Sequence, residues 1–126
     1  MKLLRAGEDY LKAILILQRQ NGKVRSLDVA EYLNVTKPSV SNAIRRLREG
    51  EFLTLDAKKR LILTPSGQEA AEHIYEKYCS IKNGLISLGV DPEIAERDAC
   101  QLEHVLSRES YEKLQELWEK QTPAEI

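Results

Sequence analysis

Residues 26–50 read SLDVAEYLNVTKPSVSNAIRRLREG, a pattern of two short helices separated by a three-residue turn. Ser26 is expected to cap the first helix, because a hydroxyl can accept a hydrogen bond from a backbone N–H of the first turn. Residues 34–36 have the composition of a turn, and Thr36 is expected to cap the second helix. Pro38 falls in the first turn of that helix, where its missing N–H costs no hydrogen bond. The segment therefore predicts a helix-turn-helix.

The sequence on either side of this segment completes a winged helix. Apolar residues recur at helical spacing from about residue 7 to residue 21, which predicts a preceding helix. After Gly50 the apolar period changes from about 3.6 to about 2 residues, which is typical of strands. Two strand-like runs, 52–55 and 60–64, flank Asp56-Ala57-Lys58-Lys59. They predict a β-hairpin, or wing, with a basic tip.

Three further helices are expected after the hairpin. Residues 64–67 start a long helix, and residues 91–93 (Asp-Pro-Glu) combine a cap, a first-turn proline and an acid favoured by the helix dipole. Ser107 can cap a last helix with an apolar side. The expected fold class is mainly α, with a winged helix-turn-helix over residues 1–64 and an all-helical domain over residues 65–126.

Charge divides at the same point in the chain. Residues 1–64 hold 13 basic and 7 acidic side chains, whereas residues 65–126 hold 6 basic and 13 acidic ones. A basic first half and an acidic second half predict that only the first half meets a polyanion such as DNA. Uneven charge on solvated helix faces is the alternative explanation.

Composition favours a cytoplasmic protein. No apolar run reaches the roughly 18 residues that span a bilayer, and the start of the chain turns acidic where a signal peptide would need its apolar core. The two cysteines, Cys79 and Cys100, are therefore expected to be reduced thiols, more often ligands or core residues than a disulfide.

The candidate contacts to double-stranded DNA are polar and basic side chains of the second helix and of the wing tip. They are Thr36, Lys37, Ser39, Ser41, Asn42, Arg45, Arg46, Lys58, Lys59 and Arg60. Ser39 and Asn42 lie in the N-terminal turns of the helix and suit base edges. Thr36, Lys37 and Ser41 are expected to contact phosphates, and the two arginines suit either purpose. The three basic wing residues fit the phosphate backbone or the minor groove. A helix hairpin whose polar face is merely solvated is the alternative.

A second candidate site lies in the acidic half. Cys100, Glu103 and His104 stand at i, i+3 and i+4, the spacing that places three side chains on one helix face. Thiolate and imidazole are softer ligands than oxygen, so the set suits a divalent transition metal. A tight site usually has four ligands and this face offers three, so the pattern alone leaves open a core face without a metal.

Five blocks of sequence carry a resemblance to a known family: EDYL at 8–11, DVAEYLNV at 28–35, PSVS at 38–41, LTPSG at 63–67 and DACQLEHVLS at 98–107. From about Gly7 to Leu117 the chain resembles the iron- and manganese-dependent repressors of the DtxR/MntR family. The last block is the most specific. The resemblance implies a winged helix followed by a helical dimerisation domain, with a divalent metal bound between them. It also implies a homodimer that represses metal-uptake genes when the metal is present.

Carried over residue by residue, the resemblance implies a primary metal site made of Asp9, Cys100, Glu103 and His104. Asp9 matches the manganese-type members, whereas Cys100 matches the iron-type members. Two carboxylates, a thiolate and an imidazole would accept Fe(II), Mn(II), Co(II) or Zn(II). Fe(II) or Mn(II) is the metal that the resemblance implies.

Two departures from the family imply one metal per subunit. Lys12 stands where manganese-type members place a glutamate for a second metal. The family's ligating histidine of the fourth helix aligns with Tyr78, or with Lys77 if the helix register slips by one. Lys12 is expected to place a fixed positive charge near the position of the second cation, and pairing with a surface acid is the alternative.

Two competing functions remain open from the sequence. The first is a winged-helix regulator in which the Cys-Glu-His face holds a structural metal, or none, and another signal operates. The second is a small zinc hydrolase with Glu103 as its base. The sequence lacks the His-Glu-x-x-His spacing of such enzymes, so no enzyme activity is expected.

Overall fold

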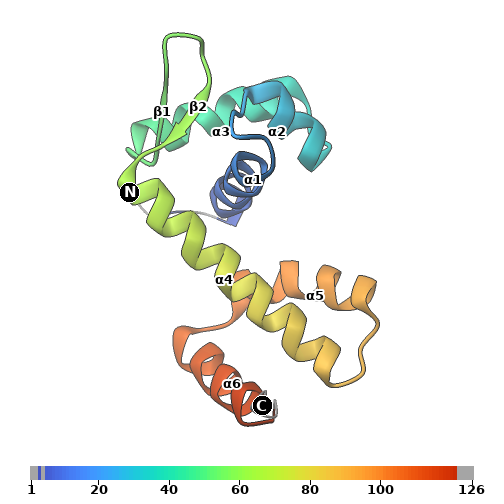
Figure 1. The fold of residues 1–126 in the computed structure, drawn as a ribbon. Helices are drawn as coiled ribbons and strands as arrows, with labels where there is room; N and C mark the ends of the chain where they lie inside the picture. Colours follow the sequence, from blue (N-terminus) through green and yellow to red (C-terminus); the bar gives the residue numbers. More distant parts are fainter. Residues whose placement is uncertain (1–2, 4, 122–126) are drawn as a thin grey trace. The chain divides into compact units, whose positions relative to one another are not determined.

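The computed structural model describes residue 3 and residues 5–121. The elements follow in the order α1 (Arg5–Asn21), α2 (Ser26–Leu33), α3 (Lys37–Glu49), β1 (Leu53–Leu55), β2 (Leu61–Leu63), α4 (Pro65–Ser87), α5 (Pro92–Val105) and α6 (Arg108–Gln121) (Figure 1). The chain divides into two compact units, Met1–Ile74 and Tyr75–Ile126. In the part of the chain that is described, no helix is long and apolar enough to cross a membrane.

The N-terminal unit is a winged helix, as the sequence predicts. Its core is aliphatic, with Leu11 and Ile14 of α1 fully buried. The strands β1 and β2 pair antiparallel, with Leu53 opposite Leu63 (Figure 1). The backbone N–H of Leu61 donates to the carbonyl of Val24 at 2.7 Å, which ties the wing to the segment before α2. Burial of aliphatic side chains therefore holds α3 and the wing on one scaffold.

The helix-turn-helix follows the expected boundaries with one correction at its start. Ser26 is the first residue of α2 and does not cap it. Instead the Asp28 carboxylate accepts a hydrogen bond from the backbone N–H of Arg25 at 2.9 Å. Asn34 adopts φ 55°, which turns the chain after α2. Thr36 caps α3 as expected, because its hydroxyl accepts from the Ser39 N–H at 3.3 Å.

The C-terminal unit packs around a small mixed cluster. Tyr78, Ile81, Ala99 and Tyr111 are buried together, and they come from α4, α5 and α6. Gly84 allows α4 to approach α6 closely, because a Cβ at this position would overlap the Trp118 indole. Close approach of helices at a glycine therefore helps to define this unit.

The caps expected in this unit are present. Asp91 accepts a hydrogen bond from the Glu93 N–H at 3.1 Å, and Ser107 accepts from the Ser110 N–H at 3.1 Å. The division into compact units falls at 74/75, and the expected domain boundary at 64/65 stays a prediction. The first turns of α4 belong to the N-terminal unit, where Ala71 is fully buried.

Candidate DNA interface and metal centre

Helix α3 has a buried side and a polar side. Val40, Ile44 and Leu47 are buried against the core of the N-terminal unit. The candidate contacts on and before this helix are all exposed: Thr36, Lys37, Ser39, Ser41, Asn42, Arg45 and Arg46. An exposed basic face on a helix held by its opposite side is the arrangement that enters a major groove.

The two neighbouring arginines of α3 are engaged differently. Arg45 donates from Nη2 to Asn42 Oδ1 at 2.6 Å and from Nη1 to Glu49 Oε1 at 2.9 Å. Within residues 3 and 5–121, the Arg46 guanidinium makes no hydrogen bond or ion pair, while its backbone carbonyl accepts from the Gly50 N–H at 3.0 Å. Arg45 therefore orients the Asn42 amide, while Arg46 is available to an anion.

A cleft of about 570 Å³ separates the start of α1 from α3 within the N-terminal unit. Gly7, Tyr10 and Leu47 contribute an apolar part of its wall, and Ser39 and Arg46 contribute a polar part. Burial raises the pKa of the Tyr10 hydroxyl, so this side chain stays neutral. The Arg46 guanidinium, the Ser39 hydroxyl and the Glu49 carboxylate line the cleft beside the N-terminal turn of α1.

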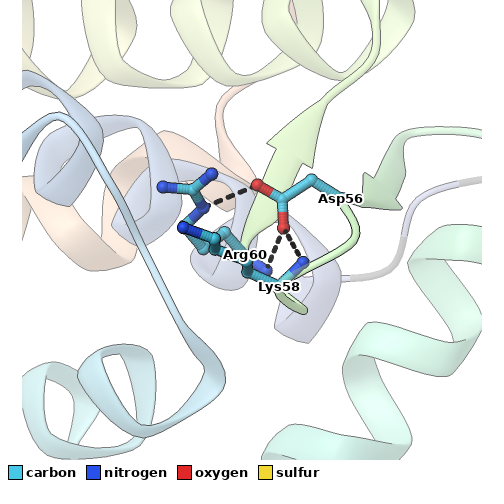
Figure 2. A network of polar contacts seen from close by, with 3 residues as sticks. All are labelled: Asp56, Lys58 and Arg60. Carbon is cyan, nitrogen blue, oxygen red and sulfur yellow. Dashed lines mark hydrogen bonds and ion pairs between the residues drawn. The ribbon is translucent and has the colours of Figure 1, made fainter.

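The wing tip is organised by one carboxylate. Asp56 Oδ1 accepts from the backbone N–H groups of Lys58 and Arg60, both at 2.9 Å, and Oδ2 accepts from Arg60 Nε at 2.6 Å (Figure 2). These hydrogen bonds hold the pKa of Asp56 below its ordinary value, and the bond from the Arg60 backbone N–H has the largest effect. Lys59 turns the chain with φ 61°.

Figure 2 shows that the Arg60 side chain has a structural role, because its Nε donates a hydrogen bond to Asp56. The DNA contact expected of Arg60 stays a prediction. Lys58 and Lys59 are exposed, while Arg60 is half-buried. An aspartate at the first position of a turn is a known signal for this type of bonding. Sequence reasoning noted the basic tip and missed the carboxylate that shapes it.

In the C-terminal unit, α5 brings Glu103 and His104 together. His104 Nε2 lies 3.2 Å from Glu103 Oε1, and the two side chains are 2% and 0% exposed. Two ligands that each lie about 2.1 Å from a metal, at adjacent corners of an octahedron, are about 3 Å apart. The separation of the imidazole nitrogen and the carboxylate oxygen therefore fits a shared divalent cation.

The other two expected ligands, Cys100 and Asp9, are both half-buried. Cys100, one turn before His104 on α5, packs against the Tyr78 cluster. Asp9 is a half-buried residue of α1 in the N-terminal unit. The donor chemistry of Cys100, Glu103 and His104 suits a transition metal, and these three side chains belong to one helix.

The residues expected to exclude a second metal are buried. Lys12 of α1 and Tyr78 of α4 are each 8% exposed. The Lys82 ammonium lies 5.5 Å from the centroid of the Tyr78 ring. A phenol beside a lysine is a poor place for a further cation, because the ammonium already supplies a positive charge.

The N-terminal unit is a winged helix that exposes a basic helix, which is typical of DNA-binding proteins. The C-terminal unit buries a carboxylate beside an imidazole, which indicates a second, ligand-binding unit. The chain belongs to the iron-dependent repressor family. Residues 2–61 match the N-terminal DNA-binding domain of that family, and residues 64–122 match its metal-binding and dimerisation domain.

Individual relatives agree with this assignment. The transcriptional regulator MntR of Salmonella typhimurium is 36% identical over 103 residues, a match that covers 82% of this chain and 66% of the relative. The HTH-type transcriptional regulator MntR of Geobacillus kaustophilus is 31% identical, with 87% of this chain and 78% of the relative covered. An uncharacterized HTH-type regulator of Methanocaldococcus jannaschii is 33% identical, with 90% and 92% covered.

Solved structures give the same fold. The manganese regulator SloR superimposes with a TM-score of 0.80 at 29% identity, covering 90% of this chain and 53% of that protein. The IdeR of T. acidophilum gives a TM-score of 0.79 at 26% identity, covering 94% and 55%. The chain thus spans about half the length of these two structures.

Proposed function

We propose that this chain is a metal-dependent transcriptional regulator that acts as a homodimer in the cytoplasm and represses metal-uptake genes. In this proposal residues 1–64 bind the DNA operator, and residues 65–126 bind metal and form the dimer. The two family domains, matched over 2–61 and 64–122, support this division. No catalytic role is assigned to any residue.

The observation that carries the proposal is the buried Glu103–His104 pair. A carboxylate taken out of water is costly unless it is balanced by positive charge or hydrogen bonds. A divalent cation held by Glu103, His104 and Cys100 would supply that charge. We propose Asp9 as the fourth ligand, on the basis of its match to the manganese-type members of the family.

Fe(II) or Mn(II) is the proposed metal, with one ion per chain. The manganese regulators among the related structures support this choice, and the buried Lys12 and Tyr78 support a single ion. By intrinsic affinity zinc would bind more tightly than manganese, so the metal in the cell depends on availability as well as on the ligands.

The proposed mechanism follows from where the ligands belong. Asp9 is part of the DNA-binding unit, while the other three ligands lie on α5. The bound ion would supply an electrostatic link between the two, and a dimer with linked units presents both α3 helices to half-sites at a fixed spacing. In the apo-protein the DNA-competent arrangement would be only fractionally populated, which lowers the apparent affinity in proportion.

On the DNA side, α3 reads the sequence and the wing adds charge. The Asn42 amide, held by Arg45, is the proposed reader of a base edge, together with Ser39. Arg46, at the cleft beside α1, is the proposed partner of a phosphate. Thr36, Lys37 and Ser41, with Lys58, Lys59 and Arg60 of the wing, are proposed to position the backbone.

Metal titration tests this function. Purified apo-protein is titrated with Mn(II), Fe(II), Co(II) and Zn(II) while binding to a labelled operator, selected from a random duplex library, is followed by anisotropy. One equivalent of metal per chain is expected to produce tight binding. Two tight metals per chain would refute the one-metal site.

The alternative is a winged-helix regulator with a structural or vestigial metal site and a different signal. It predicts that chelator-treated protein already binds the operator with full affinity. Operator binding of the metal-free protein, measured before any metal is added, therefore separates the two candidate functions.

A further inference from the structure

A lysine of α4 contacts the end of the helix that carries the candidate metal ligands. Lys77 Nζ donates a hydrogen bond to the backbone carbonyl of Leu106 at 2.9 Å, across 29 residues of sequence. The same ammonium lies 5.7 Å from the centroid of the Tyr111 ring in α6. All three residues belong to the C-terminal unit. The Lys77 side chain of α4 thus contacts both the residue after the end of α5 and a ring of α6.

The C-terminal end of α5 would fray without a contact that holds it. Leu106 already has extended backbone angles, φ −71° and ψ 131°, so the helix stops directly after Val105. The last carbonyls of a helix have no partner within it, and they carry the negative end of its dipole. The Lys77 ammonium places a positive charge near this end and ties Leu106, the residue directly after the helix, to α4. A hydrogen bond from a charged donor is stronger than one from a neutral donor.

The position of His104 makes this contact relevant to metal binding. His104 lies in the last turn of α5, two residues before Leu106, and Glu103 precedes it. If that turn frays, the imidazole and carboxylate lose their close approach. A site that is formed only part of the time binds its ligand with an affinity reduced by that fraction.

We propose that Lys77 is a positioning residue: it holds the last turn of α5 in its helical form, so that Glu103 and His104 are preorganised for the metal before it binds. This inference rests on the proposed function, because it assigns Lys77 a role toward the same metal site. Lys77 itself does not ligate the ion.

The test compares Lys77→Met with two other variants. Lys77→Arg keeps a charged donor, and Lys113→Met removes an exposed lysine of α6 whose ammonium pairs with Glu116 at 3.7 Å. Hydrogen exchange of backbone amides 103–107 is measured by NMR in the apo-protein, and Mn(II) affinity is measured by calorimetry.

Lys77→Met is expected to accelerate exchange of these amides about tenfold and to weaken Mn(II) binding about tenfold, the effect of losing one charge-assisted hydrogen bond. Lys77→Arg should stay within about threefold of the wild type, as should Lys113→Met. Exchange and affinity of Lys77→Met within twofold of the wild type would overturn the proposal. Equal loss in the Met and Arg variants would also overturn it, because packing alone would then explain the effect.

Two further outcomes are decisive. If Lys77→Met does not fold, Lys77→Gln, which keeps a neutral donor, replaces it in both measurements. Lys77→Gln is then expected to change exchange and Mn(II) affinity by an intermediate factor. Wild-type values in Lys77→Gln would contradict the proposal. If the wild-type protein binds no Mn(II), Fe(II), Co(II) or Zn(II), the proposed metal-dependent function fails. The exchange measurement in the apo-protein then still decides whether Lys77 holds the end of α5.

Discussion

The two units of this chain bury different kinds of side chain. Of the eight largest fully buried side chains among the described residues, seven lie before residue 75, and only Ile81 belongs to the C-terminal unit. Each unit also buries one charged side chain, Lys12 in the N-terminal unit and the carboxylate of Glu103 in the C-terminal unit. Apolar burial stabilises a fold without any ligand, whereas a buried carboxylate requires compensation. The N-terminal unit, with its larger aliphatic core, should therefore depend little on a metal, while the C-terminal unit should gain stability from a bound cation.

The largest expected effect is on the N-terminal core. Ile14→Ala removes a fully buried side chain of α1 and should lower the free energy of unfolding by about 3 kcal/mol. Urea unfolding measures this loss, which should be the same with and without metal because Ile14 is no ligand. Leu27→Ala, at a side chain that is 51% exposed, is the control and should change stability by less than about 0.5 kcal/mol. A large loss at Leu27 would contradict the assignment of the core.

The next effect concerns the metal pair. His104→Ala should lower Mn(II) affinity about a hundredfold, since it removes a ligand and loosens the carboxylate beside it. It should also abolish the rise in melting temperature that Mn(II) produces in the wild type. Glu96→Ala, on an exposed position of α5, is the matched control. Unchanged metal dependence of DNA binding in His104→Ala would refute the metal centre.

A smaller expected effect distinguishes sequence-specific DNA binding by α3 from non-specific DNA binding by the wing. Asn42→Ala should weaken binding to the selected operator by about 1–3 kcal/mol and change binding to unrelated DNA little, because base contacts carry specificity. Lys58→Met should instead weaken both by a similar factor and reduce the slope of log affinity against log salt by about 1. Equal behaviour of the two variants on both DNAs would contradict the roles given to α3 and the wing.

The smallest effect is a pH dependence confined to the wing. The pKa of Asp56 lies below its ordinary value of 3.8 because the folded state binds the carboxylate, so ionised Asp56 stabilises the hairpin. This contribution is complete above the unfolded-state pKa and is lost as the pH falls through the lowered folded-state pKa. NMR should show the Arg60 amide titrating with a midpoint below 3.8. A midpoint at or above that value would contradict the network, and Asp56→Asn should abolish the titration.

Local signals account for what the sequence could predict. Thr36, Asp91 and Ser107 cap helices with their own side chains, within three residues of the groups that they bind. Such bonds depend on neighbouring residues alone, so helix starts are readable from sequence. The prediction that Ser26 caps α2 is wrong, because Asp28, two residues later, bonds the backbone N–H of Arg25 and makes Arg25 the cap position.

Contacts between distant residues account for what it could not predict. The bond from Lys77 to the carbonyl of Leu106 spans 29 residues and depends on how α4 meets the end of α5. The pairing of Arg45 with Asn42 and Glu49 was accessible in principle from helical spacing, yet it competes with other partners of an exposed arginine. Spacing on α5 and the family resemblance predict Cys100, Glu103 and His104 as metal ligands, and these roles, like that of Asp9, stay predictions.

The most direct test of the central claim is the anisotropy of a labelled operator measured first in chelator and then after one equivalent of Mn(II) per chain. Metal that links the two units should tighten binding at least about a hundredfold, the shift expected when a competent state rises from about 1% of the population to nearly all of it. Operator binding that is equally tight in chelator would contradict the claim that metal controls this protein.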